Sequence, residues 1–386
     1  MSAFGDNAVY SVIMGILLQS VVSGRITLHE FGVMSAIYAN CLFLPYFMFA
    51  PLLGWISDYY EKRNVLIAGN LAKAAGAAIG CLGILFDVNL LMFSYLIIGC
   101  GAAVYSPSKY GIIPELNSES ELVKANAAIE MTTVVSILTG FMGGGLLIDH
   151  LRPAACFMIL IIVYALAGAC NQLMARSGIR NRDLPLAGAF PEFKHAMRTV
   201  LTSRKLYACV FGTVLLWASA AFIRLNLQTW GQSVLQLKTM TDIALLAFWL
   251  SIGIIIGSLL TGKIFKTGVI RNAWKFGLLM GVVVCVMVLW HCHQALVIGE
   301  LVLIGILGGI FVIPLNAEIQ ACSDTRNIGK IISIQNCFEN GAMLSSSGIF
   351  WGLNKLSFSP TVTFLIIGGV LCLANVLWLK PLLKKA

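Results

Sequence analysis

The chain alternates long apolar runs with short polar segments along almost its whole length. A run of about 20 predominantly apolar residues is long enough to cross a bilayer as a helix. Twelve runs of about that length follow one another, so the pattern predicts twelve spanning helices. They are Met1–Val22, Val33–Trp55, Val65–Phe86, Leu90–Ile113, Val123–Leu147, Ala154–Met174, Tyr207–Trp230, Ile243–Phe265, Ala273–Trp290, Leu296–Ile319, Ile328–Leu353 and Val362–Leu379.

The predicted spans form two groups of six, separated by the one long polar stretch, Arg176–Lys205. We expect an N-terminal six-helix bundle over residues 1–175, a linker over 176–205 and a C-terminal six-helix bundle over 206–386. The spacing from Gly101 to Pro107 in span four recurs from Gly308 to Pro314 in span ten. Two halves that repeat in the same orientation are typical of one large class of membrane transporters.

Basic residues predict the orientation of these helices, because cytoplasmic loops carry an excess of Lys and Arg. One set of loops holds 19 Lys and Arg residues and the opposite set holds 4. The rich set includes both ends of the chain and the linker. We therefore expect a multi-pass inner-membrane protein with both termini in the cytoplasm.

Composition agrees with a membrane protein, since 59% of the residues are hydrophobic and only 11% are charged. A soluble domain carries about 25% charged residues. The net charge of +9 could suggest nucleic acid, but the basic residues lie in short loops, so we expect no nucleic-acid partner. The 11 cysteines are scattered singly, and His291, Cys292 and His293 do not share one helix face. We therefore expect no metal and no cofactor.

The first span looks short at its beginning. Its apolar pattern is already running at Met1, and Asp6 follows only five residues later. A buried functional acid is expected well inside the bilayer, so we expect the native helix to extend upstream of Met1.

A loop motif follows span two. Gly54, Asp58, Lys62 and Arg63 resemble the loop signature of the major facilitator superfamily, Gly-x-x-x-Asp followed by basic residues. Gly54 permits close helix packing. Asp58 can accept hydrogen bonds from a neighbouring helix N-terminus, and Lys62 and Arg63 would hold the loop inside. The expected role is conformational; the alternative is an ordinary positive-inside loop.

Ionisable residues inside spans are costly in hydrocarbon, so they line a cavity or pair with one another. In the major facilitator architecture, helices one, four, seven and ten surround the central cavity. Asp6, Lys109 and Arg224 lie on three of these helices and are predicted to form a gate. The alternative is a static buried ion pair. Lys73 and Glu300 are interpreted as structural residues near helix ends, where their side chains can reach the interface.

Several strings give a more specific resemblance, to the bacterial lysophospholipid transporters. They are Ser2 to Ala8, Tyr105 to Gly111, Leu122 to Asn126, Ile313 to Ala317 and Gln335 to Asn340. The resemblance implies movement of lysophospholipids such as lysophosphatidylethanolamine from the outer to the inner leaflet. It also implies an acyltransferase and acyl-carrier-protein synthetase that re-acylates them on the cytoplasmic face, and we expect a monomer surrounded by membrane lipids.

The resemblance also names residues for binding and gating. The family's charged gate falls on Asp6, Lys109 and Arg224, and its helix-eleven acid falls on Glu339. The matching strings add Asn7 and Asn340, and Glu130 is a further buried acid. Arg224 or Lys109 can supply the cation that a lipid phosphate needs.

Two other functions stay open. A proton-coupled drug or polyamine exporter of the same fold would use the embedded acids Asp6, Glu130 and Glu339. Its usual Gly-Pro pair is missing between Gly140 and Gly145, where glycines occur without proline. A membrane-bound lipid enzyme is the other class. The sequence offers it no nucleophile with a matching base, so we expect no enzyme.

Overall fold

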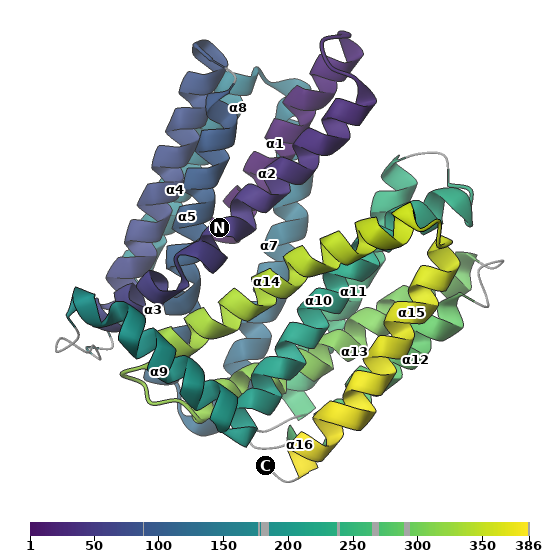
Figure 1. The fold of residues 1–386 in the computed structure, drawn as a ribbon. Coiled ribbons are helices and arrows are strands. Elements are labelled where there is room, and N and C mark those ends of the chain that lie inside the picture. The colour runs from purple at the N-terminus through teal and green to yellow at the C-terminus, as the bar shows by residue number, and fades with distance from the viewer. Residues whose placement is uncertain are drawn as a thin grey trace. The chain divides into compact units, whose positions relative to one another are not determined.

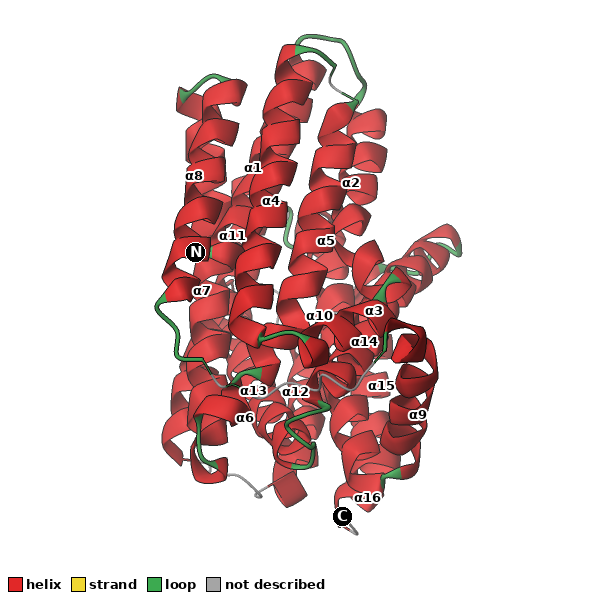
Figure 2. Ribbon diagram, turned by 90° about the vertical axis from the view of Figure 1, so that its left-hand side faces the viewer, coloured by secondary structure: helices red, strands yellow, loops and turns green. Residues whose placement is uncertain are grey.

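A computed structural model describes residues 1–384 except 88, 177, 179–184, 238–239, 265–269 and 289–293. Within these residues every regular element is helical (Figure 2). The longer helices are α1 (Ser2–Val22), α2 (Leu28–Met48), α3 (Ala50–Tyr59), α4 (Lys62–Leu85), α5 (Leu90–Gly111), α7 (Leu122–His150), α8 (Pro153–Gln172), α9 (Ala189–Thr202), α10 (Arg204–Ser233), α11 (Met240–Ile264), α12 (Ala273–Met287), α13 (Gln294–Ala321), α14 (Ile328–Lys355) and α15 (Pro360–Leu373). Short elements are α6 (Ile113–Leu116), α16 (Lys380–Lys384), the 3-10 turns η1 (Glu119–Glu121), η2 (Leu186–Gly188) and η3 (Ile270–Asn272), and the π-helical η4 (Ala374–Leu379).

The prediction of an all-α membrane protein is confirmed. Among the described residues, 10 helices are long and apolar enough to span a membrane, or 11 if one bent pair counts as a single span. Each of the twelve predicted ranges contains a helix. The helix in the eleventh predicted range, α14, is 28 residues long but less apolar than the others, because its middle carries Glu339 together with Gln335, Asn336, Asn340 and several serines.

The prediction of one continuous helix over 33–55 is wrong, because α2 and α3 meet at a bend of 71°. Pro45 has no N–H, so the carbonyl of Cys41 loses its helical partner. That carbonyl instead lies against α5, where a Cβ added to Gly99 would come within 2.5 Å of it. Pro51 then begins the new helix, in the first turn where proline is tolerated.

Contacts group the chain into two compact units. The first comprises Met1–Leu116, Val135–Lys194 and Thr325–Cys337, and the second comprises Asn117–Val134, His195–Asp324 and Phe338–Ala386. In the first unit α4 lies beside α5 and α8, and in the second α12 lies beside α13 and α15 (Figure 1). Helices α7 and α14 each have their beginning in one unit and their end in the other. The predicted domain boundaries at the linker stay a prediction.

Within each unit the helices pack through apolar side chains and small residues. Val9, Val12 and Ile13 of α1 are buried against α5 and α8, and Trp230 of α10 meets Phe364 of α15 edge to face at 5.5 Å. Van der Waals contact is the main attraction between helices in lipid, and small residues allow the closest approach. Gly140 and Gly144 of α7 lie directly on the backbone of α1 at Phe4 and Ala8.

We predict that Gly144→Leu lowers the stability of the purified protein by about 1–3 kcal/mol, the usual cost of overpacking a tight interface. A Cβ at this position would lie 2.8 Å from the Cα of Ala8. Thermal unfolding in detergent measures the effect. Gly145→Leu is the control, since its Cβ would meet only Ser11 Oγ at 3.6 Å. Equal unfolding temperatures for the two variants would contradict the close packing of α1 on α7.

Candidate functional site

A buried polar cluster surrounds Asp6 in the first unit. Lys73 Nζ of α4 donates to Asp6 Oδ2 at 2.7 Å and to Ser2 Oγ at 2.8 Å. The Tyr164 hydroxyl of α8 donates to Asp6 Oδ1 at 2.9 Å. Both carboxylate oxygens therefore have donors from helices other than α1. The side chains of Lys73 and Asp6 are only 2% and 12% exposed, so the ion pair is shielded from solvent.

The sequence interpretation of Lys73 as a helix-end residue is wrong. Lys73 lies near the middle of α4, is buried, and supplies the cation that Asp6 was expected to find in Lys109 or Arg224. Its aliphatic stem passes over Gly101 of α5, where an added Cβ would lie 2.7 Å from Lys73 Cγ. Its ammonium lies 5.1 Å from the centre of the Tyr105 ring. A lysine near the middle of an apolar run was a sequence signal for a buried pair.

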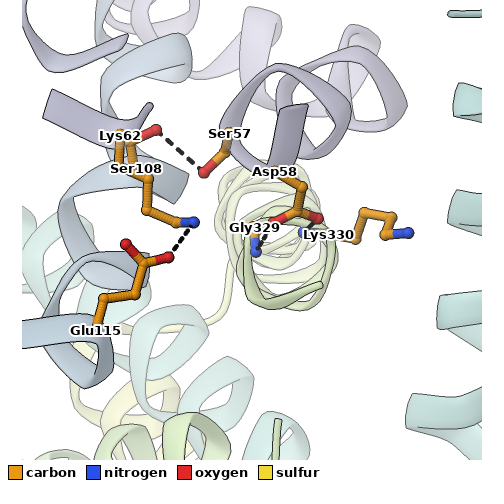
Figure 3. A network of polar contacts seen from close by, with 7 residues as sticks. All are labelled: Ser57, Asp58, Lys62, Ser108, Glu115, Gly329 and Lys330. Atoms are coloured by element: carbon orange, nitrogen blue, oxygen red, sulfur yellow. Dashed lines mark hydrogen bonds and ion pairs between the residues drawn. The ribbon is translucent and has the colours of Figure 1, made fainter. Parts of the chain in front are cut away.

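The loop motif forms a second polar cluster in the same unit, drawn in Figure 3. The carboxylate of Asp58 accepts the backbone N–H groups of Gly329 at 2.6 Å and of Lys330 at 3.0 Å. These groups belong to the first turn of α14. The first N–H groups of a helix have no partner within the helix, and the helix dipole favours an anion there. The predicted contact between Asp58 and a helix N-terminus is confirmed.

The close approach of α3 to α14 requires small residues on both helices. A Cβ on Gly54 would lie 2.9 Å from the Cα of Lys330. A Cβ on Gly329 would lie 2.6 Å from both Asp58 Oδ1 and the side chain of Ser57. Ser333 also donates its hydroxyl to the carbonyl of Ala50. Gly54 therefore lets α3 approach α14 closely enough for Asp58 to bind the first turn of α14.

The expectation that Lys62 and Arg63 hold this loop on the cytoplasmic side stays a prediction, and the structure shows which residues the two side chains contact. Lys62 is buried and donates to Glu115 Oε1 at 2.5 Å, with the two side chains 1% and 0% exposed. Arg63 instead reaches α8, where its Nη1 donates to the carbonyls of Gln172 at 3.2 Å and Met174 at 3.3 Å. These interactions tie the motif to α6 and to the C-terminal end of α8.

Further polar contacts complete the two units. In the first, Ser108 donates to Ser57 at 3.1 Å, and Lys330 Nζ bonds Glu192 of α9 at 3.1 Å. In the second, the amides of Asn126 and Gln320 exchange two hydrogen bonds, of 2.6 and 3.1 Å. There too Lys205 forms an ion pair with the buried Glu318. Glu115, Glu192, Gln320 and Tyr164 were missed by the sequence analysis, because no local pattern shows which distant helix a polar side chain meets.

The other predicted site residues are placed as follows. Arg224 is exposed on α10, whereas Glu130, Glu339 and Asn340 are buried. Asn7 is half-buried and donates to the carbonyl of Ala3 at 2.8 Å. Lys109 is half-buried, with Nζ 4.8 Å from the centre of the Tyr110 ring. Asp6 and Lys109 belong to the first unit, and Arg224, Glu130, Glu339 and Asn340 to the second. The sequence features His291, Cys292, His293, Arg180, Arg182 and Lys266 lie outside the described residues.

We predict that Lys62→Met destabilises the protein by about 3–5 kcal/mol, because it removes one charge of a buried ion pair and keeps the carboxylate of Glu115 buried. Unfolding of the purified protein by heat or denaturant measures the loss. The double variant Lys62→Met with Glu115→Leu should recover most of it, since two apolar side chains of similar size replace a buried pair at little cost. A double variant as unstable as the single one would show that the two charges do not depend on each other.

Comparison with known proteins identifies the family and the fold. The family profile of the Major Facilitator Superfamily matches residues 1–347. The solved human organic anion transporter MFSD10 superposes with a TM-score of 0.74 at 16% identity, covering 99% of this chain and 97% of that one. The Escherichia coli fucose:proton symporter FucP superposes with a TM-score of 0.72 at 13% identity, covering 100% and 98%. At these identities the two structures show the fold alone.

Sequence relatives are more specific. The lysophospholipid transporter LplT of Pectobacterium carotovorum subsp. carotovorum (strain PC1) is 32% identical over 365 residues, which cover 93% of this chain and 85% of that protein. The lysophospholipid transporter LplT of Yersinia enterocolitica serotype O:8 is 32% identical over 362 residues, covering 92% and 85%. The chain therefore belongs to the major facilitator superfamily and, within it, to the family of the lysophospholipid transporters.

Proposed function

We propose that this protein moves lysophospholipids, such as lysophosphatidylethanolamine, from the outer to the inner leaflet of a bacterial inner membrane. The observation that carries the proposal is the 32% identity to a lysophospholipid transporter across 93% of the chain. The excess of basic residues in one set of loops supports a topology with both termini and the linker in the cytoplasm.

The chemistry of the substrate calls for a cation in the binding site, and two residues are candidates for it. A lysophospholipid carries a phosphate and one long acyl chain, so its site needs a cation and an apolar wall. Arg224 is exposed on α10, and the guanidinium group binds phosphate through two parallel hydrogen bonds. Lys109 is a second, half-buried cation on α5. In our proposal Arg224 or Lys109 supplies the cation for the phosphate, while partly buried Leu215, Leu216 and Trp217 of α10 offer apolar surface.

Asp6 serves as the gating anion in this proposal. Its carboxylate pairs with Lys73 in the structure, and in another step of the cycle it would exchange that partner for Arg224 or Lys109. An unpaired charge in hydrocarbon is costly, so Asp6 releases one cation only when it can bind another. Because the substrate phosphate would bind that same cation, substrate binding is coupled to the gate. Asn7, Glu130, Glu339 and Asn340 are proposed to line the path of the head group.

Gly54, Asp58, Lys62 and Arg63 are proposed to control conformation without touching substrate. Asp58 binds the first turn of α14, Lys62 pairs with Glu115, and Arg63 bonds the C-terminal end of α8. Changing those contacts alters the equilibrium between conformations and leaves the lipid site intact. We also propose that the protein acts as a monomer. Its product would be re-acylated by an acyltransferase and acyl-carrier-protein synthetase at the cytoplasmic face, because a lipid with one chain needs a second chain to become a two-chain phospholipid.

Uptake into cells tests the transport function. Bacteria that lack their own lysophospholipid transporter, but retain the acyltransferase, receive this gene or an empty vector. With the gene, labelled lysophosphatidylethanolamine added outside should become cell-associated and then appear as two-chain phospholipid. Uptake no greater than with the empty vector, from protein that is present in the membrane, would refute the proposal. Resistance to cationic drugs in place of lipid uptake would favour the exporter.

We predict that Arg224→Ala abolishes this uptake, because the phosphate loses a guanidinium that no other side chain replaces in shape. Asp6→Ala should abolish it as well, by leaving Lys73 unpaired. The initial rate at several lipid concentrations measures both effects, with the amount of membrane protein as normalisation.

Asp58→Ala is the contrasting variant. It removes the carboxylate that accepts hydrogen bonds from the first turn of α14. The maximal rate should fall, while the concentration for half-maximal uptake stays nearly unchanged. Near-normal uptake by Arg224→Ala would eliminate the phosphate role. A large affinity loss at normal maximal rate in Asp58→Ala would overturn the division between substrate site and conformational motif.

A further inference from the structure

One buried side chain near the Asp6 cluster has no assigned role. Asn70 of α4 is completely buried, and neither its amide nitrogen nor its amide oxygen has a hydrogen-bond partner among the described residues. Burying a polar group without a partner is unfavourable, and an apolar residue would avoid the cost. An orphaned buried amide therefore calls for a functional explanation.

The position of Asn70 relative to Lys73 suggests that explanation. The two residues are three apart on α4, and helical residues at that spacing lie on the same face. Long side chains on a helix lean toward its N-terminus, which is the direction in which Asn70 lies from Lys73. Gly101 leaves room for the lysine stem, whose Cγ lies where a larger residue would clash.

The surroundings of Asn70 are polar on the side of α8 as well. A Cβ added to Gly168 would lie 3.8 Å from the Cβ of Asn70, so α8 comes close at this level. One turn further along α8 lies Asn171, close to Tyr105, whose ring faces the lysine ammonium. The amide nitrogen of Asn171 is also buried without a partner among the described residues. A polar row therefore continues from Asp6 past Lys73 to Asn70 and Asn171.

The proposed transport cycle creates a need for such a row. If Asp6 exchanges Lys73 for another cation, the released ammonium stays in a low-dielectric interior. An unpaired ammonium there is far more costly than an unpaired amide. The amide oxygen of Asn70 is a hydrogen-bond acceptor within the same buried region, and it has no partner among the described residues that it would have to give up.

We propose that Lys73 is a positioning residue for Asp6 with two resting places, and that Asn70 provides the second one. In the first place Lys73 neutralises Asp6, as the structure shows. In the second its ammonium bonds the amide oxygen of Asn70, and Asp6 is free to pair with the cation that closes the gate. The role of the second place in the cycle rests on the proposed lipid transport. Whether the Lys73 ammonium can reach Asn70 does not depend on transport.

The first experiment tests that reach without transport. Asp6→Asn should lower the unfolding temperature of the purified protein, because it leaves Lys73 without a counter-charge. Adding Asn70→Asp to this variant should restore most of the lost stability, since the new carboxylate lies where Lys73 is proposed to rest. If the double variant is no more stable than Asp6→Asn alone, Lys73 does not reach position 70 and the inference is overturned.

The second experiment tests use of the position during transport. Asn70→Leu removes the acceptor but keeps the branched shape, so the unfolding temperature should stay equal or rise. The maximal rate of lysophospholipid uptake should fall by about tenfold or more, with half-saturation changed by less than about twofold, because only a step of the cycle loses an interaction. Asn70→Asp alone should also slow uptake, by holding Lys73 away from Asp6. Full uptake by Asn70→Leu would refute the proposed role.

Ser94→Ala is the matched control. Ser94 is fully buried and donates to the carbonyl of Gly76 on α4 at 2.7 Å, one turn beyond Lys73. Its loss should lower the unfolding temperature and leave the uptake rate per transporter unchanged. If wild-type protein takes up no lysophospholipid, the proposed function fails, and the stability test of the two-place lysine still gives its own answer.

Discussion

Charges in the interior of this protein need partners, and the partners come from other helices. In hydrocarbon an isolated ion is so unfavourable that pairing decides which helices must lie together. Asp6 and Lys73 join α1 to α4, Lys62 and Glu115 join the start of α4 to the chain after α5, and Lys205 and Glu318 join α10 to α13. Each pair fixes the relative position of two helices along their axes, which apolar contacts alone do not do because they have no preferred direction.

Asp58 follows the same rule with a different partner. It binds the first backbone N–H groups of α14, so an anion meets a helix dipole together with two donors. The interaction depends on glycine at positions 54 and 329, because larger residues would push the helices apart. Tyr59 stacks on Trp55 with ring centres 4.9 Å apart. The central contact of the signature, from Asp58 to the first turn of α14, therefore stands beside an aromatic pair.

The sequence predicted much of this fold, because apolar length and the position of Lys and Arg are local properties of a membrane chain. Each predicted span contains a helix in the structure, and Asp58 binds a helix N-terminus as predicted. It could not predict the break between α2 and α3, since proline in a membrane helix is often tolerated without a large bend. Nor could it predict the partners of Asp6 and Lys62, because Lys73 and Glu115 lie 67 and 53 residues away. The gate was predicted from the helices on which Asp6, Lys109 and Arg224 lie. In the structure the carboxylate of Asp6 is already paired with Lys73, which belongs to the same unit.

The contact of Asp58 with α14 also sets an order of events during biosynthesis. The acceptor and its two donors are separated by 271 and 272 residues, and residues 325–337 form part of the first compact unit. At about 5–20 residues per second, a ribosome needs roughly 15–55 s to make the intervening chain. Through that interval Asp58 has been synthesised but its partners on α14 have not. This part of the protein therefore completes its folding only when nearly the whole chain has been synthesised.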